Sequence, residues 1–160
     1  GNTIGNAATQ VDLLTAPDTT TPVGTPRLTV KGNGNVGIGT QNPSYPLQMA
    51  SGAYVSAGGT WTNASSRDFK EDIEALSAEE ALDAVKRLHP VKFAYKTDPT
   101  EKHVGFIAED VPDLVATKDR KGLSPLDIVA VLTKVIQERQ KTISMLSKKM
   151  AELEKALDLR

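Results

Sequence analysis

The chain contains no cysteine, which excludes disulfide bonds and thiolate metal sites. Aromatic residues make up only 4% of the 160 positions, and no apolar run approaches the ~18 residues that a membrane span requires. The formal net charge of −1 gives no reason to expect binding to nucleic acid or to a membrane surface. The two histidines, His89 and His103, have no partners at the spacing of metal ligands. We therefore expect no metal, no cofactor, no nucleic-acid partner and no membrane partner.

Charge is also nearly absent from the first part of the chain. Only four charged side chains lie in residues 1–63, together with ten of the twelve glycines, and all the other charges lie in residues 64–160. This change in composition predicts two domains, 1–63 and 64–160. The N-terminal residues GNTIGNAATQ lack the basic and apolar regions of a signal peptide, and we expect the chain to be cut from a longer protein.

The first domain contains short β-type runs separated by turn residues. Strands of about five residues bury little surface, so this domain is expected to depend on neighbouring repeats or on other chains. Residues 15–26 are typical of an extended connector. Residues 32–37 fit the pattern G-x-G-x-x-G, but no helical period follows them, which argues against a nucleotide site. The β-type runs are RLTVK (27–31), NVGIGT (35–40), YPLQMA (45–50) and AYVSAGGTW (53–61).

The second domain begins with a helix and a hairpin. Residues 77–88 have an apolar face, and Ser77 and Glu80 form a capping-box pattern at their start. Residues 91–96 and 102–111 follow as two strands, and the turn residues between them predict a β-hairpin.

The chain ends in a long uninterrupted helix, predicted over residues 126–160 with Pro125 in its first turn. Such a helix would span roughly 52 Å, which is too long for a small domain to cover, so we expect self-association. Residues at alternating three- and four-residue spacing form an apolar seam, interrupted by Arg139, that is typical of a coiled coil. The predicted core positions are Val129, Leu132, Ile136, Ile143, Leu146, Met150, Leu153 and Leu157.

Four segments of the second domain carry a resemblance to a known family. They are SSRDFKEDI (65–73), LHPVKFAYK (88–96), VGFIAEDV (104–111) and IVAVLTKVIQERQKTI (128–143). In this order they resemble the C-terminal intramolecular chaperone domain, or peptidase S74 domain, of phage endosialidases and tailspikes. The stretch NVGIGTQNPSYPLQM also resembles the β-structured shaft that precedes such domains. The resemblance implies an α+β protein: a short β-rich shaft, then a helix, a β-hairpin and a long helix that forms a coiled coil, as a parallel homotrimer.

The family resemblance also implies an activity. Such domains trimerise, promote folding of the β-structured region upstream in the same chain, and then cut themselves off as single-turnover serine endopeptidases. The family's cleavage motif begins with a serine that is followed five residues later by a lysine, here Ser65 and Lys70. The bond cut is then Ala64–Ser65. In many members an acidic residue or asparagine follows the serine, where this chain has Ser66.

The chemistry of a serine–lysine pair explains why assembly would matter. A serine hydroxyl is a weak nucleophile and needs a base. A lysine with the ordinary pKa of about 10.4 is protonated at neutral pH, so it becomes a base only when desolvation lowers its pKa. Trimer assembly is expected to supply that burial, so that cleavage waits for the upstream fibre to fold. The sequence does not indicate which group stabilises the oxyanion.

Simpler interpretations of the same residues remain open. Ser65 could be only the N-cap of a helix in which Asp68 is the third residue. Lys70 could be only a solvated lysine on the surface. Glu109 and Asp110 are adjacent on an expected strand, so a structural role is favoured over an acid–base pair. The alternative function is a non-cleaving trimerisation cap of a phage tail fibre or bacterial surface adhesin. Either function implies a location in a virion tail fibre or spike, or on a bacterial surface, with the chaperone part made in the host cytoplasm.

Overall fold

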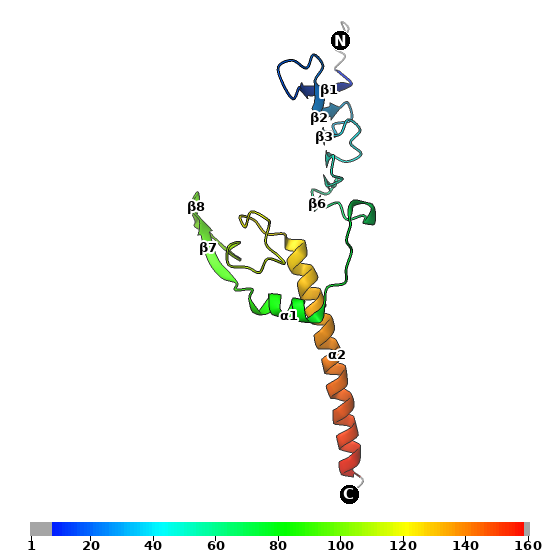
Figure 1. Cartoon of the computed structure of the whole chain (residues 1–160), viewed down its shortest axis with the longest axis vertical. Helices are drawn as coiled ribbons and strands as arrows, with labels where there is room; N and C mark the ends of the chain where they lie inside the picture. Colours follow the sequence, from blue (N-terminus) through cyan, green and yellow to red (C-terminus); the bar gives the residue numbers. More distant parts are fainter. Residues whose placement is uncertain (1–7, 159–160) are drawn as a thin grey trace. The chain divides into compact units, whose positions relative to one another are not determined.

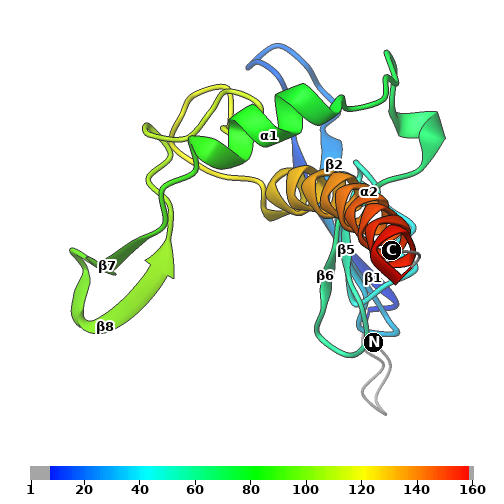
Figure 2. The same cartoon turned by 90° about the horizontal axis from the view of Figure 1, so that it is seen from below.

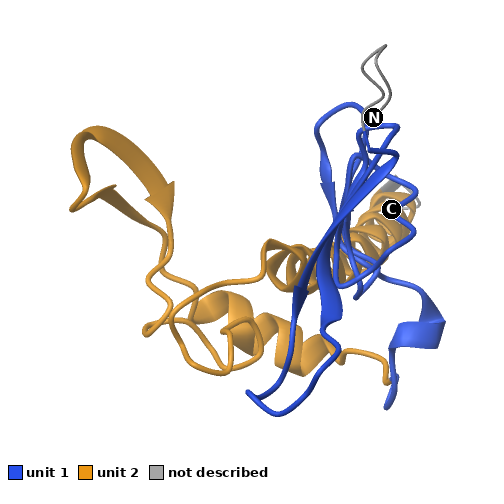
Figure 3. Ribbon diagram, turned by 90° about the horizontal axis from the view of Figure 1, so that it is seen from above, with its two compact units in different colours: residues 1–73 blue, residues 74–160 orange. Residues whose placement is uncertain are grey.

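A computed structural model describes residues 8–158 of this α+β chain. The chain divides into two compact units, Gly1–Ile73 and Glu74–Arg160, referred to below as the N-terminal and C-terminal units (Figure 3). The unit boundary lies after the change in charge, so residues 64–73 have the charged composition of the second part but pack with the first.

The N-terminal unit is a single sheet in which the strands follow one another in chain order (Figure 1). All neighbouring strands are antiparallel except the third and fourth, which are parallel. The strands are short, as the sequence predicts. They are β1 (Gln10–Thr15), β2 (Thr25–Lys31), β3 (Val36–Ile38), β4 (Leu47–Met49), β5 (Tyr54–Val55) and β6 (Trp61–Thr62).

Strand β1 is not among the predicted strands, and the connector predicted over residues 15–26 is shorter than expected. Thr15 still belongs to β1, and β2 begins two residues before Arg27. The β1–β2 register shifts between Leu13 and Leu14, where a β-bulge interrupts the alternation that marks a strand in sequence. This bulge explains why the residues of β1 do not alternate regularly between apolar and polar.

The sheet buries no large apolar side chain of its own among the described residues. The fully buried side chain in this unit is the polar Thr29, whose hydroxyl donates to the Asp12 carboxylate. Val11, Leu13 and Trp61 are each at least half exposed. A sheet with so little buried apolar area gains little stability from the hydrophobic effect. The expected dependence of the β-region on neighbours stays a prediction.

Three hairpins of this sheet use one and the same tight turn. In each, the first residue donates its N–H to the carbonyl of the fifth, and the fourth residue, a glycine, donates to the carbonyl of the first. These glycines are Gly34, Gly52 and Gly59, with φ of +89°, +88° and +82°. A three-residue hairpin loop needs such a left-handed residue, which explains why glycine stands at this place each time.

The C-terminal unit consists of two helices and one hairpin, with the hairpin projecting away from both helices (Figures 1 and 2). Its small core joins α1 to the first turns of α2 and to the loop before it. Among residues 8–158 no helix has the length and apolarity to cross a membrane. The elements are α1 (Ala78–Lys86), β7 (Val91–Tyr95), β8 (Asp98–Gly105) and α2 (Pro125–Asp158), and the core residues are Ala81, Ala84, Val111, Val115, Val131 and Val135.

The capping box predicted at the start of α1 is confirmed. The Ser77 hydroxyl accepts from the Glu80 N–H at 3.2 Å, and the Glu80 carboxylate accepts from the Ser77 N–H at 3.1 Å. Two N–H groups that the helix leaves without partners are satisfied in this way.

The predicted hairpin is confirmed, but the bounds of its second strand are wrong. Strand β8 begins at Asp98, within the expected linker, and ends at Gly105, before the expected end at Val111. After a β-bulge between Phe93 and Tyr95, Tyr95 pairs with Asp98, so only two residues separate the two strands. Beyond Gly105 the chain leaves the hairpin, because Val111 is buried in the helical core rather than paired in a strand.

The long helix is confirmed and carries two apolar surfaces. Val131 and Val135 are buried against the core, at 2% and 7% exposure. The eight predicted core positions of the seam lie elsewhere on the helix and are 41–70% exposed. Arg139 is exposed as well. The predicted residues 159–160 lie outside the described part of the chain.

Candidate functional site

The structure brings Ser65 and Lys70 into direct contact. The Lys70 Nζ donates a hydrogen bond of 2.8 Å to the Ser65 Oγ. Between them the chain forms one turn of 3-10 helix, η1 (Arg67–Phe69). The turn ends at Lys70, whose extended backbone (φ −130°, ψ 143°) follows the helical residues. Both side chains are exposed in the single chain.

The capping residue of this turn is Ser66, so the interpretation of Ser65 as the N-cap is wrong. The Ser66 backbone is extended (φ −61°, ψ 149°), and its hydroxyl accepts from the Asp68 N–H at 3.3 Å. The Asp68 carboxylate in turn accepts from the Ser66 hydroxyl, also at 3.3 Å. Since Ser66 supplies the cap, the hydroxyl of Ser65 is the one that pairs with Lys70.

The charges around Lys70 leave its amine without a close acid. Among residues 8–158 no carboxylate oxygen lies within 4.0 Å of the Lys70 nitrogen, although acidic residues stand on both sides of it in sequence. A nearby carboxylate would favour the charged form of a lysine and oppose a role as base. The local geometry therefore places a serine hydroxyl against an amine that forms no ion pair within residues 8–158.

The backbone of η1 uses most of its own N–H groups. Asp68 donates to the Ser66 hydroxyl, Phe69 to the Ser66 carbonyl and Lys70 to the Arg67 carbonyl. None of these three N–H groups is directed at an oxyanion on Ala64. These three N–H groups are therefore occupied within the turn and do not serve as oxyanion donors in this conformation.

Other residues singled out in the sequence have structural surroundings. Glu109 forms an ion pair of 2.8 Å with Lys121, and this hydrogen bond holds the pKa of the Glu109 carboxyl below its ordinary value. His103 lies against the rings of Phe93 and Tyr95, at centroid distances of 5.6 and 5.1 Å. Within residues 8–158 no group of three acidic or histidine side chains is arranged to hold a metal ion.

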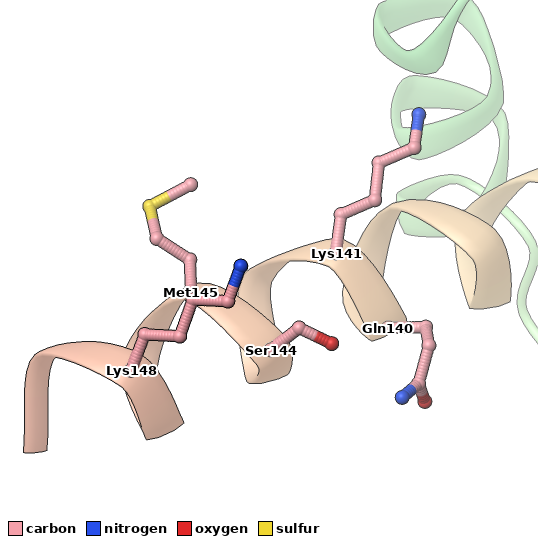
Figure 4. A pocket seen from close by; sticks show the side chains of 5 residues that line it. All are labelled: Gln140, Lys141, Ser144, Met145 and Lys148. Carbon is pink, nitrogen blue, oxygen red and sulfur yellow. The ribbon is translucent and has the colours of Figure 1, made fainter. Parts of the chain in front are cut away.

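Two hollows of the C-terminal unit show no chemistry of their own. One is a shallow surface on α2 formed by consecutive turns of the same helix, with Lys141, Met145 and Lys148 directed to solvent (Figure 4). The other is an apolar groove of about 560 Å³ beside the β7–β8 hairpin, lined by Phe93, Phe106 and neighbouring residues.

Two residues with structural importance are missed by sequence reasoning. Arg120, in the left-handed region at φ 52°, donates to the carbonyls of Glu109 and Val111 and to the Asp113 carboxylate. Gly52 lies next to Ala64 in the described structure. The sequence signals a turn at Gly52, but nothing in it indicates which segment packs on that turn.

The comparison with protein families matches residues 65–118 to the Peptidase_S74 model, chaperone of endosialidase. The match covers about a third of the chain, and it supports a likeness of this segment to the chaperone-of-endosialidase family. The matched segment begins at Ser65, contains Lys70 and runs through α1 and the hairpin. Comparisons with the curated proteins and with the solved structures found no match.

The assignment of the cap to Ser66 can be tested by amide hydrogen exchange. Ser66→Ala removes a capping bond of about 1 kcal/mol, so exchange at the Asp68 amide is expected to rise about fivefold. Ser65→Ala leaves that bond in place and is the matched control. Equal exchange rates at Asp68 in the two variants would show that Ser66 is not the cap.

Proposed function

We propose that this chain is an intramolecular chaperone that assembles as a parallel homotrimer, promotes folding of the β-structured region upstream, and then releases itself by cutting Ala64–Ser65. The observation that carries the proposal is the 2.8 Å hydrogen bond between Lys70 and Ser65 at the first residue of the family match. The proposed site of the whole protein is a phage tail fibre or spike, or a bacterial surface adhesin. The chaperone part would be made in the host cytoplasm and released.

The proposed reaction starts from the contact between the two side chains. A neutral Lys70 amine takes the Ser65 hydroxyl proton, and the Ser65 Oγ attacks the Ala64 carbonyl carbon. The bond from that carbon to the Ser65 nitrogen breaks, and the nitrogen takes up a proton from Lys70 to become an amine. The product is an ester between Ala64 and the Ser65 Oγ. Water then hydrolyses this ester to give a carboxylic acid at Ala64 and to restore the Ser65 hydroxyl.

Assembly supplies the trigger in this proposal. Lys70 is exposed in the single chain, where an ordinary lysine is protonated at neutral pH. Contact with neighbouring chains would remove water from the amine, and desolvation favours the neutral form that can act as a base. Cleavage would therefore follow assembly, after the upstream region has folded. If assembly leaves Lys70 in water, the chain is the non-cleaving trimerisation cap instead.

The exposed seam of α2 supports the assembly step. Eight large apolar side chains at heptad spacing lie along one helix and are each at least 41% exposed. A stripe of this kind is costly to leave in water and is the pattern that coiled coils bury. Arg139 interrupts the stripe, and a polar core residue is a known means of setting register.

Self-cleavage can be followed on a denaturing gel. The wild type is expected to separate over time into fragments 1–64 and 65–160, and Ser65→Ala is expected to stay whole. Lys70→Ala and Lys70→Arg are each expected to slow cleavage by about 10²- to 10⁴-fold, since both lack a neutral amine base. Lys118→Ala, at an exposed loop position, is the matched control and is expected to cut at the wild-type rate. A monomer that cuts as fast as the trimer, or a trimer that stays whole on prolonged incubation, would refute the proposal.

The seam can be tested with two acidic substitutions on one helix. Ile143→Asp places three carboxylates in the proposed core and removes about 1.5–3 kcal/mol of apolar burial per chain, so the trimer is expected to dissociate. Met145→Asp introduces the same charge at a position that is equally exposed, 56% against 55%, but lies off the seam, and is expected to remain trimeric. Sedimentation equilibrium gives the mass of each variant relative to the 17.1 kDa chain. Dissociation of both variants, or of neither, would contradict the assignment.

A further inference from the structure

The space beside the Cα of Gly52 is bounded by the residue before each member of the Ser65–Lys70 pair. A methyl group placed on Gly52 would lie 3.2 Å from the Cβ of Ala64, which precedes Ser65. It would also lie 3.4 Å from the ring of Phe69, which precedes Lys70. The absence of a side chain at Gly52 therefore leaves room for both ends of the segment that carries the two side chains.

The turn that carries Gly52 depends on the sheet. Gly52 is the fourth residue of the turn that joins β4 to β5, with its N–H donated to the Met49 carbonyl at 3.0 Å. The Met49 N–H is donated to the Ala53 carbonyl at 2.7 Å. These bonds close the hairpin whose strands β4 and β5 pair at Leu47–Val55 and Gln48–Tyr54, so the turn beside Ala64 and Phe69 is part of the folded sheet.

We infer that Gly52 is a positioning residue for self-cleavage: through it the folded β4–β5 turn holds the Ser65–Lys70 segment in the shape that pairs the two side chains. This inference rests on the proposed function and adds a second condition to it. Assembly would make the amine neutral, whereas the turn would bring the hydroxyl to it. An unfolded shaft would then leave the nucleophile and the base unpaired, even in an assembled trimer.

The chain provides two matched controls. Gly34 and Gly59 occupy the same place in the same kind of turn, with φ of +89° and +82° against +88° for Gly52. A Cβ at Gly34 or Gly59 would meet no described atom within 4 Å. Alanine at any of the three positions therefore creates the same backbone strain, and only alanine at Gly52 presses on the cleavage segment.

The test compares cleavage rates of the full chain. Gly52→Ala is expected to cut about tenfold more slowly than Gly34→Ala or Gly59→Ala, because a small displacement of reacting groups has a large effect on rate. Adding Ala64→Gly removes the closest contact and is expected to recover about threefold in rate, relative to its effect in the wild type. A role in turn stability alone would not be rescued in this way, because the strain at Gly52 is unchanged. Equal rates in the three glycine variants, or no rescue, would overturn the inference.

A second measurement separates this inference from the proposed function. Hydrogen exchange of the peptide that covers residues 64–72 is expected to be faster in Gly52→Ala than in the other two glycine variants. If the wild type cuts and all three variants exchange and cut alike, only the role of Gly52 is refuted. If the wild type does not cut, the proposed function fails, and the exchange rates alone decide whether Gly52 holds the segment. In that case, equal exchange rates in the three glycine variants would also refute the role of Gly52 in holding the segment.

Discussion

A lysine amine that meets a serine hydroxyl in water is the constraint on which this account depends. The Lys70–Ser65 hydrogen bond provides the contact, but an exposed lysine carries a proton at neutral pH and cannot accept another. The same contact becomes reactive only if water is removed from the amine. Contact and protonation are therefore separate requirements of the proposed cleavage. The structure shows the contact, and the proposed assembly would supply the surroundings that change the protonation.

The rest of the chain is consistent with that dependence on neighbours. The N-terminal sheet buries no large apolar side chain among its described residues, and α2 exposes the eight apolar positions of its seam. Both features leave apolar surface in water that association would bury. In the proposed trimer, one event would cover the seam, support the shaft and desolvate the amine. The contact at Gly52 would link the shaft to the same site within each chain.

Local signals were predictable from the sequence, and tertiary contacts were not. The Ser77–Glu80 capping box and Pro125 mark the starts of α1 and α2, because both act locally: the capping box through hydrogen bonds within four residues, and Pro125 through its fixed φ and its missing N–H. The roles of the two adjacent serines were not predictable in this way, because the sequence allows either Ser65 or Ser66 to cap the turn. In the structure Ser66 is the cap, and Ser65 bonds to Lys70. The end of β8 and the neighbours of Gly52 depend on packing between distant segments, which leaves no pattern in a single sequence.

The ester on Ser65 is the species that sets this mechanism apart from cleavage by another protease or by direct hydrolysis. Hydroxylamine added to the assembled wild-type chain would intercept that ester, and mass spectrometry of the N-terminal fragment would identify its new end. The proposed mechanism predicts a fragment that ends in a hydroxamic acid at Ala64, and no such fragment from Ser65→Ala. A fragment that ends elsewhere, or only in a carboxylic acid at Ala64 at every hydroxylamine concentration, would contradict it.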